Sequence, residues 1–220
     1  MDERTRLAVG TLLRVYADID ILALELCSDR LPFAPSAAAR KELMDQIKEE
    51  VVHFAIQENT LNALGMPFSP VMTLDRRQEI KKWFSGLDWY GFLAALQLGI
   101  EGIGIVIVEQ VALRAGTLIQ ESLRIPIADE MRQTSFGVRE WKGLLGRCSE
   151  KERTEHLERV LRIFEELYVK AESALPVAFE DHWAVLGLKK EDLWVRVRER
   201  TLFILESAGF EAALPAGFIR

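Results

Sequence analysis

The sequence predicts an all-α fold, and three observations support this prediction. Apolar residues recur at helical spacing along nearly the whole chain. No stretch alternates apolar and polar residues between turn signals, as a half-buried strand would. The 7 prolines and 14 glycines are few and fall mostly between the periodic stretches. Because 49% of the 220 residues are hydrophobic, the chain can bury a sizeable core, which excludes intrinsic disorder of the whole chain.

Capping residues and helix breakers divide the chain into six long helices and one short helix. The expected helices begin near a capping side chain or a proline, and most end before a glycine or a proline. Ser149 and Glu152, for example, have the spacing of a capping box. Pro126 is expected to open a helix, because a proline in the first turn has no N–H to lose. The expected helices cover about residues 3–29, 36–64, 74–84, 88–122, 126–146, 149–175 and 190–208.

We expect a single domain over residues 1–220. No Gly/Ser-rich linker, low-complexity stretch or internal repeat divides the chain. Four long helices would form a core over about residues 3–147, and the remaining helices would add to it over about residues 149–209.

Charge and cysteine content narrow the classes of partner. The 28 basic and 34 acidic residues give a net charge of -6, which makes a nucleic-acid partner unexpected. The 2 cysteines form no disulfide framework, and the opening MDERTRLAVG lacks the pattern of a secretory signal, so we expect a cytoplasmic protein.

The most apolar stretch, Gly91 to Leu113, contains Glu101 and Glu109, which favours a buried helix over a membrane span.

Several carboxylates fall on or near the apolar faces of the expected core helices. Glu50 lies in the middle of the apolar arc of the second helix, and His53 follows one turn later. Glu101 and Glu130 occupy comparable positions on the third and fourth long helices, and Glu25 lies near the apolar stripe of the first. A carboxylate buried in such a stripe must be paired, protonated or bound to a metal.

Taken singly, these signals have ordinary explanations. A lone Glu-x-x-His pattern is common by chance, and a glutamate at a helix edge, such as Glu25, more often reaches solvent than binds a ligand. The set is more informative, because it places a carboxylate on each of four long helices. Glu50 and His53 form one Glu-x-x-His pattern, and Glu130 with Gln133 nearly forms a second. Dimetal helix bundles hold their ions with two Glu-x-x-His pairs and two further glutamates.

The fourth of these helices carries a motif that resembles a known family. Its segment DEMRQTSFGVR, from Asp129 to Arg139, is similar to the DEARHxxFGxR pattern of ferritin-like di-metal carboxylate oxidases. Within that class it resembles the ribonucleotide-reductase-small-subunit-like ligand-binding oxidases and the diiron N-oxygenases. Glu101-Gly102 and the segment Val195 to Gly209 are also similar. The resemblance implies a ferritin-like four-helix bundle with additional C-terminal helices and an O₂-activating Fe/Fe or Mn/Fe centre.

The same resemblance implies roles for individual side chains. Glu25 and His53 would bind the first metal, and Glu50 would bridge the two ions. Asp129 would accept the other ring N–H of His53, as ligating histidines generally require. From its position on the helix, one turn before Glu101, Gln97 is a further candidate for a residue that supports the ligands. The implied metal ligands are Glu25, Glu50, His53, Glu101, Glu130 and Gln133.

Gln133 departs from the family pattern, which has a histidine at this position. An amide oxygen is a weaker ligand than imidazole for iron or manganese. Three outcomes are open: Gln133 ligates through its oxygen, it holds a ligating water, or the second metal is weakly held or absent. Ferritin ferroxidase centres also combine one Glu-x-x-His with a glutamine on the fourth helix.

The expected function is therefore a dimetal oxidase or oxygenase. It would use O₂ to oxidise a small apolar or amine substrate in a pocket inside the bundle, and a homodimer is compatible with this class. A ferroxidase or iron-binding protein is one alternative. A non-catalytic bundle with a degenerate metal site is another, and Gln133 is its main support.

Overall fold

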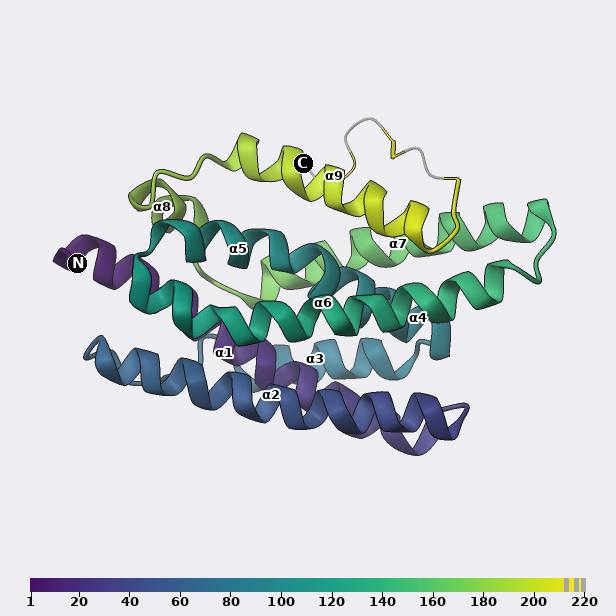
Figure 1. Cartoon of the computed structure of the whole chain (residues 1–220), viewed down its shortest axis with the longest axis horizontal. Helices are drawn as coiled ribbons and strands as arrows, with labels where there is room; N and C mark the ends of the chain where they lie inside the picture. Colours follow the sequence, from purple (N-terminus) through teal and green to yellow (C-terminus); the bar gives the residue numbers. More distant parts are fainter. Residues whose placement is uncertain (212–213, 216–217, 219–220) are drawn as a thin grey trace.

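The computed structural model describes residues 1–211, 214–215 and 218 of the chain. Within these residues every regular element is a helix, which confirms the predicted all-α class (Figure 1). In chain order the elements are α1 (Glu3–Arg30), the short 3₁₀ turn η1 (Leu31–Phe33), α2 (Ala37–Ala63), α3 (Leu74–Ser85), α4 (Trp89–Leu93), η2 (Ala94–Ile103), α5 (Gly104–Arg114), α6 (Thr117–Leu145), α7 (Glu150–Ala174), α8 (Phe179–Val185) and α9 (Lys190–Ser207).

Most helix ends follow the capping residues seen in the sequence. The Ser36 side chain accepts a hydrogen bond from the Ala39 N–H at the start of α2. Ser149 and Glu152 form the expected capping box at the start of α7. Gly65, just after α2, has a φ of 67°, a conformation that glycine adopts without steric cost. The short α8 lies between the helices expected at 149–175 and 190–208, in a stretch for which no helix was expected.

The boundary between the third and fourth long helices was predicted wrongly. The chain breaks at Gly116, where φ is 92°, and α6 begins at Thr117. Pro126, expected to open a helix, lies buried inside α6. A positive φ takes the residue out of the helical conformation, whereas an internal proline removes one N–H donor and crowds the carbonyl four residues earlier, which a helix can accommodate by kinking. The glycine is therefore the stronger breaker here.

The expected third helix is also not uniform. Its middle segment, η2, is a π-helix, in which the Gly104 N–H bonds to the carbonyl of Gly99, five residues earlier. π-Helical turns are rare and occur frequently at functional sites. Gln97 and Glu101 both lie on this segment and are buried.

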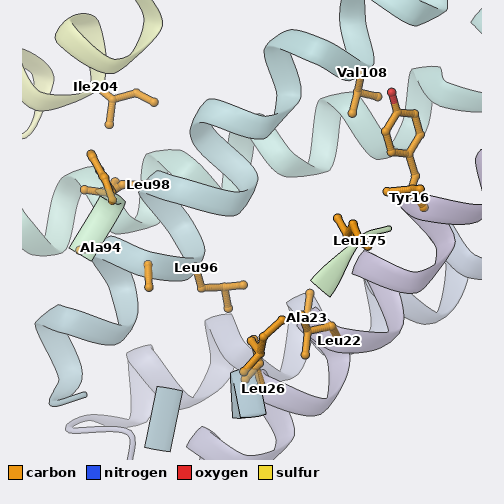
Figure 2. Packing of buried hydrophobic residues seen from close by; sticks show 14 of the residues in the cluster. Tyr16, Leu22, Ala23, Leu26, Ala94, Leu96, Leu98, Val108, Leu175 and Ile204 are labelled. Atoms are coloured by element: carbon orange, nitrogen blue, oxygen red, sulfur yellow. The ribbon is translucent and has the colours of Figure 1, made fainter. Parts of the chain in front are cut away.

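The long helices pack side by side, and η2 lies against α6, α7 and α9. α1 lies against α2, α2 against α6, and α6 against both η2 and α5. Figure 1 shows α6 running through the middle of the molecule, with α2 along one side and α9 along the other. Figure 2 shows that η2 packs in two directions, with Leu96 toward α1 and Leu98 toward Ile204 of α9.

Two arginines of α6 join it to α2. Arg132 forms ion pairs with Glu42, at 2.8 Å, and with Glu49. Arg139 reaches Glu42 at 3.3 Å. These contacts hold the face of α6 that bears Gln133 against the face of α2 that bears Glu50.

The segment from Trp89 to Arg114 is long and apolar enough to cross a membrane, judged by length and composition. In the structure, 72% of its most apolar window is buried among the other helices. Core helices of this kind pass the same test, so the apolarity of this segment is explained by packing.

Candidate metal centre

Asp20 of α1 and Glu50 and His53 of α2 form a buried group that could hold a metal ion. One potential ligand atom from each side chain lies within 4.8 Å of the other two. All three residues are buried, and His53 is completely so. Two carboxylates and one imidazole suit a first-row transition-metal ion.

Helical spacing accounts for this convergence. Glu50 and His53 are three residues apart, so both point from the same face of α2, where they meet residues of α1 and α6. On α1, Asp20 follows Tyr16 by four residues and precedes Ala23 by three, and all are buried. Asp20 is thus part of the α1 stripe that packs against α2.

Hydrogen bonds orient the three side chains. The His53 ring places Nδ1 3.2 Å from Glu50 Oε2 and Nε2 3.1 Å from Asp129 Oδ2. The latter is the contact expected between His53 and Asp129. Gln57 donates from Nε2 to Asp20 Oδ2 at 2.6 Å. Burial disfavours the charged imidazole, but contacts with Glu50, Asp20 and Asp129 outweigh it and raise the pKa of His53 to about 9.

Two further carboxylates, Glu101 of η2 and Glu130 of α6, lie in the same region. Burial, together with the neighbouring charge of Glu50, raises the pKa of Glu101 well above its usual range and that of Glu130 to about 8. Burial and Glu50 also raise the pKa of Asp20. These shifts come first from burial and then from repulsion between the neighbouring acids, and a bound cation would offset both.

Three glutamine side chains fill the space between α2, η2 and α6. Gln46 donates from Nε2 to Glu101 Oε1 at 2.9 Å and to Glu50 Oε1 at 3.1 Å, and the same nitrogen lies 3.2 Å from Gln133 Oε1. Gln97 donates from Nε2 to Gln46 Oε1 at 2.6 Å. The Gln133 amide in turn donates to Glu49 at 3.0 Å. Gln46 is therefore the hub of this network.

Glu25, the first-helix ligand implied by the resemblance, is not brought into the group. Its carboxylate pairs with Lys81 at 3.2 Å and with Arg77 at 3.6 Å, and its side chain is 31% exposed. The residue of α1 that lies beside Glu50 and His53 is Asp20. A metal-binding role of Glu25 stays a prediction.

Asp18, on the same helix, has a structural role. It is fully buried and accepts hydrogen bonds from Arg77, at 2.6 Å, and from the backbone of Met72 and Val71. These bonds tie α1 to the start of α3 and the loop before it. Asp18 is thus satisfied without a metal.

The sequence reasoning missed Asp20, Gln46 and Gln57. The available signal for Asp20 was the apolar repeat Leu13, Tyr16, Asp20, Ala23 and Cys27, whose spacing alternates between three and four residues. Gln46 lies four residues before Glu50 and Gln57 four residues after His53, so both share the face of α2 that bears the ligands.

A cavity of about 550 Å³ opens onto the carboxylates, a volume within the usual range for small-molecule sites. Asp20, Glu50, Glu101 and Glu130 lie in its wall, and most of the remaining lining is apolar. Figure 2 shows the Tyr16 hydroxyl pointing past Val108, another lining residue.

Buried polar atoms without a hydrogen-bond partner suggest that the cavity binds a ligand. Among the residues that the structure describes, neither the Tyr16 hydroxyl nor Gln57 Oε1 has a hydrogen-bond partner, although both atoms are buried. Both residues line the cavity. Buried polar groups are rarely left unsatisfied, so these atoms are expected to meet water, metal-bound or not, or a substrate.

Comparison of the sequence with protein-family models and with curated proteins finds no match.

Proposed function

We propose that this protein is a metal-dependent oxidoreductase that uses O₂ to oxidise a small apolar or amine substrate. The observation that supports this most strongly is the apolar cavity whose wall contains Asp20, Glu50, Glu101 and Glu130. A cavity of this kind can hold an apolar molecule against a metal-binding group inside a helix bundle. The all-helical fold and the DEMRQTSFGVR segment are compatible with a ferritin-like dimetal protein.

The residues present fit one metal ion well. Asp20, Glu50 and His53 would hold it, and the orphaned Gln57 Oε1 and Tyr16 hydroxyl lie on the side of the cavity. Bound iron or manganese would supply the O₂ chemistry.

The residues of the chain would orient the metal ligands and the substrate and would exclude water from the site. Asp129 fixes the ring of His53, and Gln57 fixes the carboxylate of Asp20. The apolar lining would bind the substrate and keep bulk water from the site, while the Tyr16 hydroxyl would orient its polar end.

The paired Fe/Fe or Mn/Fe centre implied by the resemblance would also use Glu101, Glu130 and Gln133. These three residues fit a second metal ion less well, because Glu101 Oε1 and Gln133 Oε1 both face the Gln46 amide nitrogen.

Anaerobic loading with Fe(II) followed by exposure to O₂ tests the proposal. The protein should retain iron through desalting and consume O₂ faster than the same concentration of free Fe(II), with a rate that changes when a substrate fills the cavity. Glu50→Ala should lose both the iron and the O₂ consumption. Iron-loaded protein that reacts with O₂ no faster than free Fe(II) would contradict the proposal.

A second candidate, a non-catalytic bundle, is favoured by the glutamine network. Gln46 satisfies oxygens of Glu50 and Glu101 without a cation. Under this alternative the protein purified from metal-supplemented medium carries no metal, and Glu50→Ala changes stability only.

A further inference from the structure

We propose that Gln46 takes the place of a second metal ion, so that the site binds a single cation at Asp20, Glu50 and His53. This inference rests on the proposed metal site and specifies how many ions it holds. It differs from the paired centre that the sequence resemblance implies.

The Gln46 amide nitrogen lies where oxygens from three elements converge. Glu50 of α2, Glu101 of η2 and Gln133 of α6 each place an oxygen between 2.9 and 3.2 Å from it. Gln46 itself is 1% exposed. Two amide hydrogens facing three acceptor oxygens supply partial positive charge at a point where a cation would otherwise bind those oxygens.

Neighbouring contacts fix the direction of this amide. Gln97 donates to Gln46 Oε1 at 2.6 Å, which turns the Gln46 nitrogen toward Glu50 and Glu101. Gln97 has little freedom to move away, because a Cβ added at Gly137 of α6 would lie 2.6 Å from Gln97 Cβ. The amide is thus held by tight packing between η2 and α6.

The glutamine at position 133 complements this arrangement. Its nitrogen donates to Glu49 at 3.0 Å, while its oxygen faces Gln46. Glu49 is also paired with Arg132. Gln133 therefore has a role of its own in place of the family's histidine, because its side-chain amide links Gln46 to the ion-pair network that joins α2 and α6.

Counting bound Mn(II) tests the inference without measuring activity. Full-length wild-type protein, Gln46→Ala and Gln46→Ala/Gln133→His would be loaded with Mn(II) anaerobically, desalted and analysed for metal content and by electron paramagnetic resonance. Wild type should hold about one Mn(II) per chain with the six-line signal of an isolated ion. Both Gln46 variants should hold about two and show the broadened signal of a coupled pair.

Gln110→Ala is the matched control. Gln110 is a buried glutamine of α5 that accepts a hydrogen bond from Arg114 on its own helix, so this variant should keep the wild-type metal count. If Gln46→Ala does not fold, Gln46→Glu offers a second test, because a carboxylate of the same length cannot donate and would attract a cation.

The outcomes separate the two proposals. Two Mn(II) ions in wild type, or one in wild type and still one in the folded Gln46 variants, would overturn the role of Gln46 and leave the metal site standing. No bound Mn(II) or Fe(II) in any of the proteins would overturn the metal site itself.

Discussion

Asp20, Glu50, Glu101 and Glu130 bring four acids into one buried region with a single imidazole, that of His53, in direct contact with Glu50. Such a group is costly unless protons, hydrogen bonds or a cation compensate the charge. Burial, together with the charge of Glu50, raises the pKa values of Asp20, Glu101 and Glu130, which favours their protonated forms in the metal-free protein. Metal ions compete for these carboxylates with protons and amide hydrogens.

Replacing Asp20 and Glu25 separately tests which acid of α1 contributes to metal binding. Asp20→Asn removes an anionic ligand from the buried group and should weaken Mn(II) binding by more than ~10-fold, since even supporting residues commonly contribute that much. Glu25→Gln should leave the Mn(II) affinity unchanged, because the Glu25 carboxylate is paired with Lys81 and Arg77. Isothermal titration of both variants with Mn(II) measures the difference. A loss of affinity in Glu25→Gln with none in Asp20→Asn would show that the ligand on α1 is Glu25, as the resemblance implies, and not Asp20.

For single residues, the sequence predicted positions that follow from the geometry of one helix, but not those that depend on which helices pack together. Glu50 lies at the centre of an apolar arc and His53 one turn later, so their shared face follows from helix geometry alone. The choice between Asp20 and Glu25 depends on which side of α1 meets α2 and which meets the cations of α3, Arg77 and Lys81. That choice is a tertiary property, and so is the position of Gln46.

Among the elements, η2 connects the packing of the bundle to the site. It carries Gln97 and Glu101, and its close contact with α6 depends on Gly137. The π-helical segment was not predictable from the sequence, because its apolar pattern also fits an ordinary helix. The break at Gly116 was missed for a related reason: Pro126 offered a competing signal, and only the φ of 92° at Gly116 decides between them.

Gly137→Ala should destabilise the protein by pushing η2 away from α6. The new methyl group would meet Gln97 Cβ at 2.6 Å, and this atom is attached directly to the backbone and cannot rotate away. Overpacking of this kind costs about 1–3 kcal/mol, which equals or exceeds the ~1 kcal/mol that alanine gains over glycine in a helix. The displacement of Gln97 should also weaken its bond to Gln46. Urea unfolding measures the change in the free energy of unfolding.

Gly143→Ala on the same helix is the control for this prediction. Gly143 is exposed, and a Cβ added there would have no neighbour within 4 Å among the residues that the structure describes. It should therefore stabilise the protein slightly, by up to ~1 kcal/mol. Equal stabilisation by both substitutions would show that η2 and α6 are not in tight contact.

For the whole molecule, the buried acids mean that the net charge of -6 is not all surface charge. At least Asp20, Glu50 and Glu101 are buried. A metal that binds the folded protein and not the unfolded chain stabilises it by mass action, about 2.7 kcal/mol at a free concentration 100 times Kd. Metal loading and pH should therefore act on global stability through the same groups.

The metal-free protein should lose stability as the pH rises from neutral into the alkaline range. The pKa of Glu130 is raised from 4.5 to about 8 on folding, and that of His53 from 6.5 to about 9. In both cases the folded state binds the proton more tightly, so the stabilisation is complete below the unfolded pKa and is lost as the pH passes the folded pKa. The combined loss should be on the order of a few kcal/mol between pH 6.5 and about 9.

Thermal unfolding followed by circular dichroism in the presence of a chelator measures this dependence of stability on pH. Glu130→Gln should make it shallower, because the amide does not titrate, and saturating Mn(II) should flatten or reverse it, because the metal favours the deprotonated carboxylates. A metal-free Tm that rises with pH over this window would show that these two groups do not bind protons as the structure indicates.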